Sequence, residues 1–238
     1  KALKEEIMNN SLEIKNLSKK YLNKIALTNV NLNFEGGKIY GLMGPNGSGK
    51  TTLMKVVAGL HKASTGDVLI NGEPVSYLTK GIVAYMPTEN FLVDSFKVSG
   101  IIDYYKDMYA DFDKDKCINL IKKLDIDINQ KVSALSSGLA AKLKIAVTLS
   151  RQAAIYMLDE PLNGIDIIAR EAIIETIVNS YDENKIIIIS SHIVDEIEKL
   201  FDAVVFIKDA TVVLSGDAEE LRTQRQMSIE NIYKEVYR

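Results

Sequence analysis

The sequence predicts an α/β fold with a largely parallel sheet, and two observations support that prediction. Short runs of apolar and β-branched residues alternate with segments of helical periodicity, which is the pattern of strands joined by crossover helices. Between about residues 91 and 150 the strand pattern stops, and apolar residues recur at helical spacing. We therefore expect an α/β core that is interrupted by an all-helical insert.

The composition is that of a globular protein. Of the 238 residues, 47% are hydrophobic and 26% are charged, which excludes a disordered or fibrous chain. The single cysteine, Cys117, excludes an internal disulfide and a cysteine-based zinc site, and two histidines argue against a histidine-rich metal site. The net charge of −3 removes the electrostatic basis for binding nucleic acid.

No segment of the sequence is typical of a membrane span or a secretion signal. Apolar runs such as residues 186–189 are far shorter than the roughly 20 residues that cross a bilayer. No charged segment followed by a signal-type apolar stretch is found. We therefore expect a cytoplasmic protein.

The first half of the core has alternating strands and one helix. Alternation of apolar and polar residues, as in residues 12–17, predicts half-buried strands, and Asn71-Gly72 predicts a tight hairpin turn. A helix is expected over residues 51–60, where Gly59 closes it. Strands are predicted at residues 12–17, 25–34, 38–43, 68–70 and 82–86.

The second half repeats this alternation after the insert. Strands are predicted at residues 155–158, 186–190 and 204–207, and helices at residues 167–181, 194–201 and 229–236. We divide the chain into an irregular lead at 1–10, a core at 11–90 and 151–216, a helical insert at 91–150 and a C-terminal helical extension at 217–238.

A glycine-rich loop is the strongest motif. Residues 44–51 match G-x-x-x-x-G-K-[ST], follow an apolar strand and open a helix, as a phosphate-binding loop does. Its backbone N–H groups and the helix N-terminus attract an anion. Lys50 is expected to reach the β- and γ-phosphates, and the Thr51 hydroxyl to bind Mg²⁺. The candidate residues here are Gly44, Asn46, Gly47, Ser48, Gly49, Lys50, Thr51 and Thr52.

Two acids end a buried strand at residues 155–158. In P-loop ATPases an aspartate at this point, here Asp159, holds the Mg²⁺ shell. A following glutamate, here Glu160, can accept a proton from the attacking water. Adjacent strand residues face opposite ways, so the two acids are expected to differ in role. His192 follows another strand end, where its side chain can point into the same site.

A serine–glycine turn lies between these two motifs. Residues 135–139 precede an amphipathic helix, with Ser136 or Ser137 as a good N-cap and Gly138 allowing close approach. Alone, this pattern is also that of an ordinary helix start. The order of phosphate loop, serine–glycine turn and acidic strand along the chain favours a functional interpretation.

With these motifs in this order, the chain resembles the nucleotide-binding domain of an ATP-binding cassette (ABC) transporter over about residues 11–224. The resemblance implies a P-loop NTPase with a RecA-like core, a small antiparallel β region and an inserted helical subdomain. The family's motifs are matched by residues 44–51 (Walker A), 155–160 (Walker B), 135–139 (signature), 162–166 (D-loop), His192 (switch histidine) and Tyr21 (the aromatic residue that stacks on adenine).

Two positions depart from the family pattern. The signature has Ser137 for its first glycine and Leu139 for its glutamine, while Ser136 and Gly138 keep the hydroxyl and backbone N–H expected to meet the γ-phosphate. Thr88 stands where the family usually has glutamine. Its shorter side chain would reach Mg²⁺ through a water molecule, or Glu89 would take its place.

The resemblance also implies ATP and Mg²⁺ as ligands, with Thr51, Asp159 and Thr88 at the metal. Two ATPase subunits, identical or paralogous, would pack head to tail around two ATP molecules. An integral membrane subunit on another chain would be driven by this dimer and would dock near Phe91, Leu92 and Phe96, at the inner face of the cell membrane.

Within the family, the chain resembles ATPase subunits of bacterial ABC-2 exporters of the bacitracin-exporter-like or Ytr type. Residues 104–109 contribute to this resemblance. Three alternatives stay open at this point. They are a soluble ABC-type ATPase outside transport, a P-loop kinase or GTPase, and a regulatory module that binds ATP with little turnover.

Overall fold

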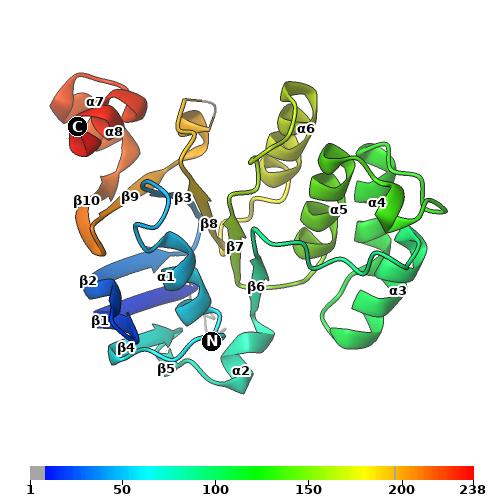
Figure 1. Ribbon diagram of the computed structural model, residues 1–238, viewed down its shortest axis with the longest axis horizontal. Coiled ribbons are helices and arrows are strands. Elements are labelled where there is room, and N and C mark those ends of the chain that lie inside the picture. The colour runs from blue at the N-terminus through cyan, green and yellow to red at the C-terminus, as the bar shows by residue number, and fades with distance from the viewer. Residues whose placement is uncertain (1–8, 196) are drawn as a thin grey trace, which may run out of the picture.

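The computed structural model describes residues 9–195 and 197–238, and two sheets form its framework (Figure 1). Most of the expected lead at 1–10 lies outside the described residues. The smaller sheet has the order β2-β1-β4-β5, and its strands pair antiparallel. They are β1 (Ser11–Tyr21), β2 (Lys24–Glu35), β4 (Thr65–Ile70) and β5 (Glu73–Pro74). Asn71 and Gly72, both with positive φ, form the predicted turn between β4 and β5.

The larger sheet has the order β10-β9-β3-β8-β7-β6, and all of its pairs are parallel except β10 with β9. Its strands are β3 (Lys38–Met43), β6 (Val83–Met86), β7 (Ile155–Asp159), β8 (Ile186–Ser191), β9 (Ala203–Lys208) and β10 (Thr211–Asp217). Parallel strands end at one edge of a sheet, so the loops after β3, β7 and β8 meet there. This confirms the predicted α/β fold class.

Alternation along the central strands divides the core into two layers. On β7, Tyr156 and Leu158 join a cluster with the buried side of α6 (Ile167–Val178), whereas Ile155 and Met157 face a second cluster with α1 (Lys50–Val57). Every side chain of β7 and β8 is buried. This explains why these strands have continuous apolar runs rather than alternation.

A third cluster belongs to the helical insert. The helices α3 (Val98–Met108), α4 (Lys114–Lys123) and α5 (Ser137–Leu149), with the 3-10 turn η1 (Val132–Ala134), pack around apolar residues that include the buried Cys117. Figure 1 shows these helices (green) on one side of the larger sheet, with the smaller sheet (blue) on the other. The boundaries proposed for the domains stay a prediction.

One predicted helix is wrong. Residues 194–201 contain only the 3-10 turn η2 (Glu198–Leu200) among their described members. Val194, Ile197 and Phe201 are all buried, as their spacing indicates. Backbone bonds from Ile197 to Val194 and from Phe201 to Glu198 span three residues, and a bond from Glu198 to Val194 spans four. Short 3-10 turns bury the same spacing without an α-helix.

The sequence analysis also missed two elements, the strand β10 and the short helix α2 (Tyr77–Gly81). The chain then forms α7 (Ala218–Arg225) and α8 (Ile229–Tyr237), where a helical extension was expected. In the part of the chain that the structure describes, no helix combines the length and apolar character needed to cross a bilayer.

Candidate nucleotide-binding site

The glycine-rich loop joins the end of β3 to the start of α1. Gly49 has φ 121°, and a Cβ there would lie 2.6 Å from the carbonyl oxygen of Ala26, so only glycine fits. Gly47 also has a positive φ, of 82°. No side chain caps the N-terminus of α1, which leaves its first backbone N–H groups to an anion.

Lys50 is held inside this loop although it is charged. Its side chain is 5% exposed, and Nζ donates to the carbonyl oxygens of Gly44 at 2.6 Å and Pro45 at 3.3 Å. Nζ also lies 3.3 Å from Oε1 of Glu160. The loop backbone thus fixes the ammonium group beside the candidate base.

Among the described residues, the buried Oγ of Ser48 has no hydrogen-bond partner, and the buried Oε1 of Glu160 has an ion pair with Lys50 but no hydrogen bond. A buried polar atom without a partner is costly unless a ligand or its bound water supplies one. A cavity of about 490 Å³, within the range of ligand sites, opens beside the loop and is lined by Glu160 but not by Ser48. Its lining consists of Tyr21, Lys24, Ala26, Asn46, Gly47, Gly49, Lys50, Thr51, Thr52, Thr88, Glu160 and Asn163. The residues present therefore fit a nucleotide with its metal.

Asp159, the last residue of β7, pairs in register with Ser190, the next-to-last residue of β8. The Ser190 hydroxyl donates to Oδ1 of Asp159 at 2.5 Å and accepts from the backbone N–H of Glu160 at 2.9 Å. The Tyr85 hydroxyl donates to Oδ2 at 3.3 Å. Burial, and then the Asp159 carboxylate, raise the pKa of Tyr85 well above its ordinary value, so it stays a donor.

Ser190 and Tyr85 are site residues that the sequence analysis missed. The sequence contains the information needed to find Ser190, because both strands are predicted and the ends of neighbouring parallel strands lie side by side. Tyr85 lies on the edge strand β6, one residue before its end, and its reach to Asp159 depends on a register that the sequence does not show.

Glu160 takes a different direction from Asp159, as predicted. Its φ of 50° turns the chain out of the strand, and Oε2 lies 2.7 Å from Nδ1 of His192. Lys50 and His192 therefore hold the two carboxylate oxygens of Glu160, one each. A carboxylate oriented in this way can accept a proton from a water molecule beside it.

Thr88 lines the cavity, but its hydroxyl donates to the backbone carbonyl of Asp159, at 3.3 Å, rather than to a carboxylate. Lys144, on α5, holds the same loop: its Nζ donates to the carbonyl oxygens of Thr88 at 3.0 Å and Glu89 at 3.2 Å, and lies 5.4 Å from the ring centre of Phe91. Burial lowers the pKa of Lys144. Sequence reasoning also missed this lysine.

Tyr21, at the end of β1, lines the other end of the cavity. Its hydroxyl shares a hydrogen bond with Nδ1 of His61, the two rings meet edge to face, and Lys19 lies over the Tyr21 ring at 4.7 Å. His61 therefore orients this aromatic side chain.

Ser136 and Gly138 are not brought to the cavity. Ser136 is the N-cap of α5, and its Oγ accepts from the N–H of Leu139 at 3.2 Å. Gly138 packs on the start of α6, where a Cβ would lie 3.2 Å from Oδ2 of Asp166. Figure 1 shows α1 and α5 on opposite sides of β6 and β7.

Comparisons with known proteins agree with this geometry. The ABC transporter family model matches residues 27–163, more than half of the chain. The ABC transporter ATP-binding protein YtrB of Bacillus subtilis is 30% identical over 216 residues, covering 90% of this chain and 74% of YtrB. The lantibiotic transport ATP-binding protein SrtF of Streptococcus pyogenes is 33% identical over 223 residues, covering 87% of this chain and 90% of SrtF.

A solved structure, the ATP-binding subunit of an ABC transporter, shares the fold with a TM-score of 0.85 and 24% identity, covering 95% of this chain and 99% of that one. The phosphate loop, the acidic strand end and these matches together lead to one conclusion. The chain belongs to the ABC transporter family, as an ATP-binding subunit that is an ATPase.

Proposed function

We propose that the cavity beside the glycine-rich loop binds Mg²⁺-ATP and that Glu160 activates the water that attacks the γ-phosphate. The observation that supports this is the grouping of Lys50, Glu160 and His192: the ammonium lies 3.3 Å from one oxygen of Glu160, and the imidazole 2.7 Å from the other. Lys50 neutralises phosphate charge, and His192 keeps Glu160 in position to accept a proton.

The oxygen donors that we assign to Mg²⁺ are Thr51 and Thr88, which line the cavity, and Asp159, which is fully buried at the end of β7. Mg²⁺ prefers such ligands. The ion would neutralise charge on the phosphates as the terminal phosphoryl group leaves. Asp159 is suited to this task because Ser190 and Tyr85 orient both of its oxygens. Thr88, whose hydroxyl contacts the Asp159 carbonyl, would act through a water molecule.

Two subunits close the site in this proposal. Ser136 and Gly138 lie away from the cavity of their own chain, so they are free to approach the γ-phosphate held by a second subunit, with the N-terminus of α5 directed at it. Ile167 and Ile168, at the start of α6, are more than two thirds exposed although apolar. Such residues favour burial against a second copy.

A groove between the core and the helical insert is the site we propose for a membrane subunit, which places the chain at the cytoplasmic face of the membrane. The groove has a volume of about 650 Å³. Its lining is Lys55, Ala58, Leu60, Lys80, Val83, Ala84, Tyr85, Pro87, Glu89, Phe91, Tyr104, Tyr105, Met108, Tyr109, Thr148 and Arg151. An apolar helix would fit it, with Leu60 and Met108 exposed at its rim.

This groove corrects the docking residues expected from the sequence. Leu92 is 6% exposed because it belongs to the core of the helical insert. Phe91 lines the groove. Phe96 is 37% exposed, but it contacts Tyr104 rather than lining the groove.

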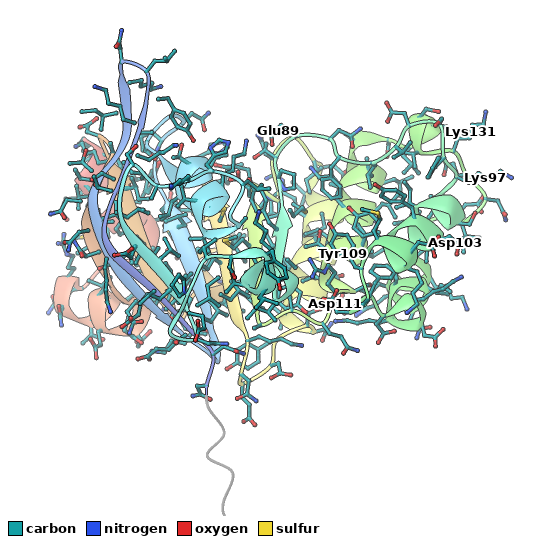
Figure 2. The ribbon with its side chains drawn as sticks, turned by 90° about the horizontal axis from the view of Figure 1, so that it is seen from below. Glu89, Lys97, Asp103, Tyr109, Asp111 and Lys131 are labelled. Atoms are coloured by element: carbon teal, nitrogen blue, oxygen red, sulfur yellow. The ribbon has the colours of Figure 1, made fainter. Side chains whose placement is uncertain are left out.

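The test is Lys50→Ala, measured by titration calorimetry with Mg²⁺-ATP on the full chain. We expect the loss of measurable binding, while Lys131→Ala, an exposed lysine at the far end of the insert (Figure 2), keeps the affinity of the unchanged protein. Normal affinity in Lys50→Ala would contradict the site.

Glu160→Gln tests the chemistry. We expect it to bind ATP, to lose about 10²- to 10⁴-fold in turnover and to accumulate an ATP-bound dimer in light scattering. Unchanged turnover would remove Glu160 as the base.

A further inference from the structure

Helix α8 contacts the ATP site from outside the cavity. It packs through Ile229 and Ile232, both fully buried, on the cluster that also contains Met43 and Phe206. Met43 ends β3 and directly precedes the glycine-rich loop. Figure 1 shows α7 and α8 (red) beside β9 and β10, at one end of the larger sheet.

The Tyr237 hydroxyl lies where two strand ends meet. It is 3.1 Å from the carbonyl oxygen of Met43 and 3.0 Å from that of Ile207. The pairing of β3 with β9 ends at Met43 and Phe206, so this hydroxyl supplies a donor at the point where the ladder stops. Gly44 lies against the same place, because a Cβ on it would be 2.4 Å from the Ile207 oxygen.

The surroundings hold this tyrosine in place. Its ring centre is 4.4 Å from that of Tyr233 and 6.2 Å from that of Phe206. Lys208 Nζ donates to the carbonyl oxygen of Val236 at 2.8 Å, which also complements the negative C-terminal end of α8. Burial raises the pKa of the Tyr237 hydroxyl, which therefore keeps its hydrogen at neutral pH.

The start of α8 reaches a second part of the site. The backbone N–H of Glu230 donates to Oε2 of Glu198 at 2.8 Å, and Glu198 lies in the segment that follows His192. One helix thus contacts both the residue before the phosphate loop and the chain that leads away from His192.

We propose that Tyr237 is a positioning residue for ATP binding. Its hydroxyl contacts the carbonyl oxygens of Met43 and Ile207, and it thereby fixes the peptide between Met43 and Gly44 with which the glycine-rich loop begins. Helix α8 then sets the affinity for ATP without contacting it. Loss of the hydroxyl leaves both carbonyl oxygens without this donor, and the loop samples positions in which its N–H groups no longer converge on the phosphates. The inference rests on the proposed ATP site.

The experiment compares Tyr237→Phe with Tyr181→Phe in the full chain. The Tyr181 hydroxyl donates to the carbonyl oxygen of Gly37 at 2.8 Å, which is the same bond made just before β3, at the end away from the loop. For Tyr237→Phe we expect the Kd and KM for Mg²⁺-ATP to rise about three- to tenfold with kcat changed less than about twofold. Tyr181→Phe should leave both within about twofold.

Thermal unfolding with and without Mg²⁺-ATP completes the test. The rise in Tm at a fixed ATP concentration should be smaller for Tyr237→Phe than for the unchanged protein. Unchanged ATP affinity in Tyr237→Phe, or an equal loss in Tyr181→Phe, would overturn the proposal. If the unchanged protein and Lys50→Ala bound ATP equally, the proposed function itself would fail, so the two failures are distinguishable.

Discussion

Two of the attachments between the helical insert and the core differ in chemistry. Where the chain enters the insert, after β6, one amine holds the loop: Lys144 donates to the carbonyl oxygens of Thr88 and Glu89. Where the chain leaves it, between α5 and β7, Arg151 makes the attachment with a planar guanidinium. The first contact adapts by rotation of a flexible side chain, and the second does not.

Each nitrogen of the Arg151 guanidinium has a hydrogen-bond partner. Its Nε is 3.1 Å from each carboxylate oxygen of Asp111, and its two terminal nitrogens donate to the carbonyl oxygens of Val83 at 3.0 Å and Gly81 at 2.7 Å. Its guanidinium also lies 4.2 Å from the ring centre of Tyr109. Figure 2 shows Tyr109 and Asp111 on the side of the insert that faces the sheet.

The difference shows which end of the insert is suited to move. The Arg151 end is fixed to the start of β6, whereas the Lys144 end adjoins Thr88 and the Asp159 backbone at the ATP site. A turn of the insert about Arg151 would therefore move Lys144 relative to Thr88, and the ion pair between Lys123 of α4 and Glu175 of α6 would also have to adjust.

The largest expected effect follows from Arg151→Met, which leaves Asp111 without its partner and two carbonyl oxygens without donors. We expect a loss of about 3 kcal/mol in the free energy of unfolding, measured by urea denaturation. Arg225→Met removes a surface pair with Glu235 and should cost less than about 1 kcal/mol. Equal losses in the free energy of unfolding for the two variants would show that Arg151 does not fix this end of the insert.

A smaller effect on stability and a clearer one on turnover are expected from Lys144→Met, which keeps most of the side-chain stem. Stability should fall by about 1 kcal/mol or less, while kcat for ATP falls about three- to tenfold because Thr88 is no longer tied to α5. The control is Lys142→Met, since Nζ of Lys142 donates at 3.4 Å to Leu124, within the insert. If both variants lose turnover equally, the contact at Thr88 has no special role.

The smallest expected effect is a dependence of the free energy of unfolding on pH. Burial lowers the pKa of Lys144 in the folded chain, so between that value and the ordinary 10.5 the unfolded chain binds more protons. The stability of the unchanged protein relative to Lys144→Met should therefore rise with pH in this window and be constant below it. Urea denaturation of both proteins from pH 8 to about pH 11 measures the difference, and a fall with pH would contradict the assigned cause.

Sequence reasoning predicted the elements whose pattern is local. The strands β3, β7 and β8 have apolar runs, the glycine-rich loop has its own spacing, and Ser136 does cap α5. Most of the cavity lining was predicted from these motifs, because residues that follow parallel strands meet at one edge.

Contacts made by long side chains across elements could not be predicted in this way. Lys144 reads as an exposed residue of an amphipathic helix, and its target is a pair of backbone carbonyl groups 56 and 55 residues away in sequence. The Tyr237 hydroxyl contacts Met43 across 194 residues. Such contacts leave no periodic pattern in the sequence, since they depend on how the elements pack.

Ser190 makes the two acids of the site depend on each other. One hydroxyl gives its hydrogen to Asp159 and accepts the backbone N–H of Glu160, so a shift of either acid changes the bond to the other. The effects of substitutions at Asp159 and Ser190 should therefore not add, because their side chains share one hydrogen bond. Glu160 takes part through its backbone N–H, which a side-chain substitution keeps. A change at one of these positions alters the geometry in which the others are tested.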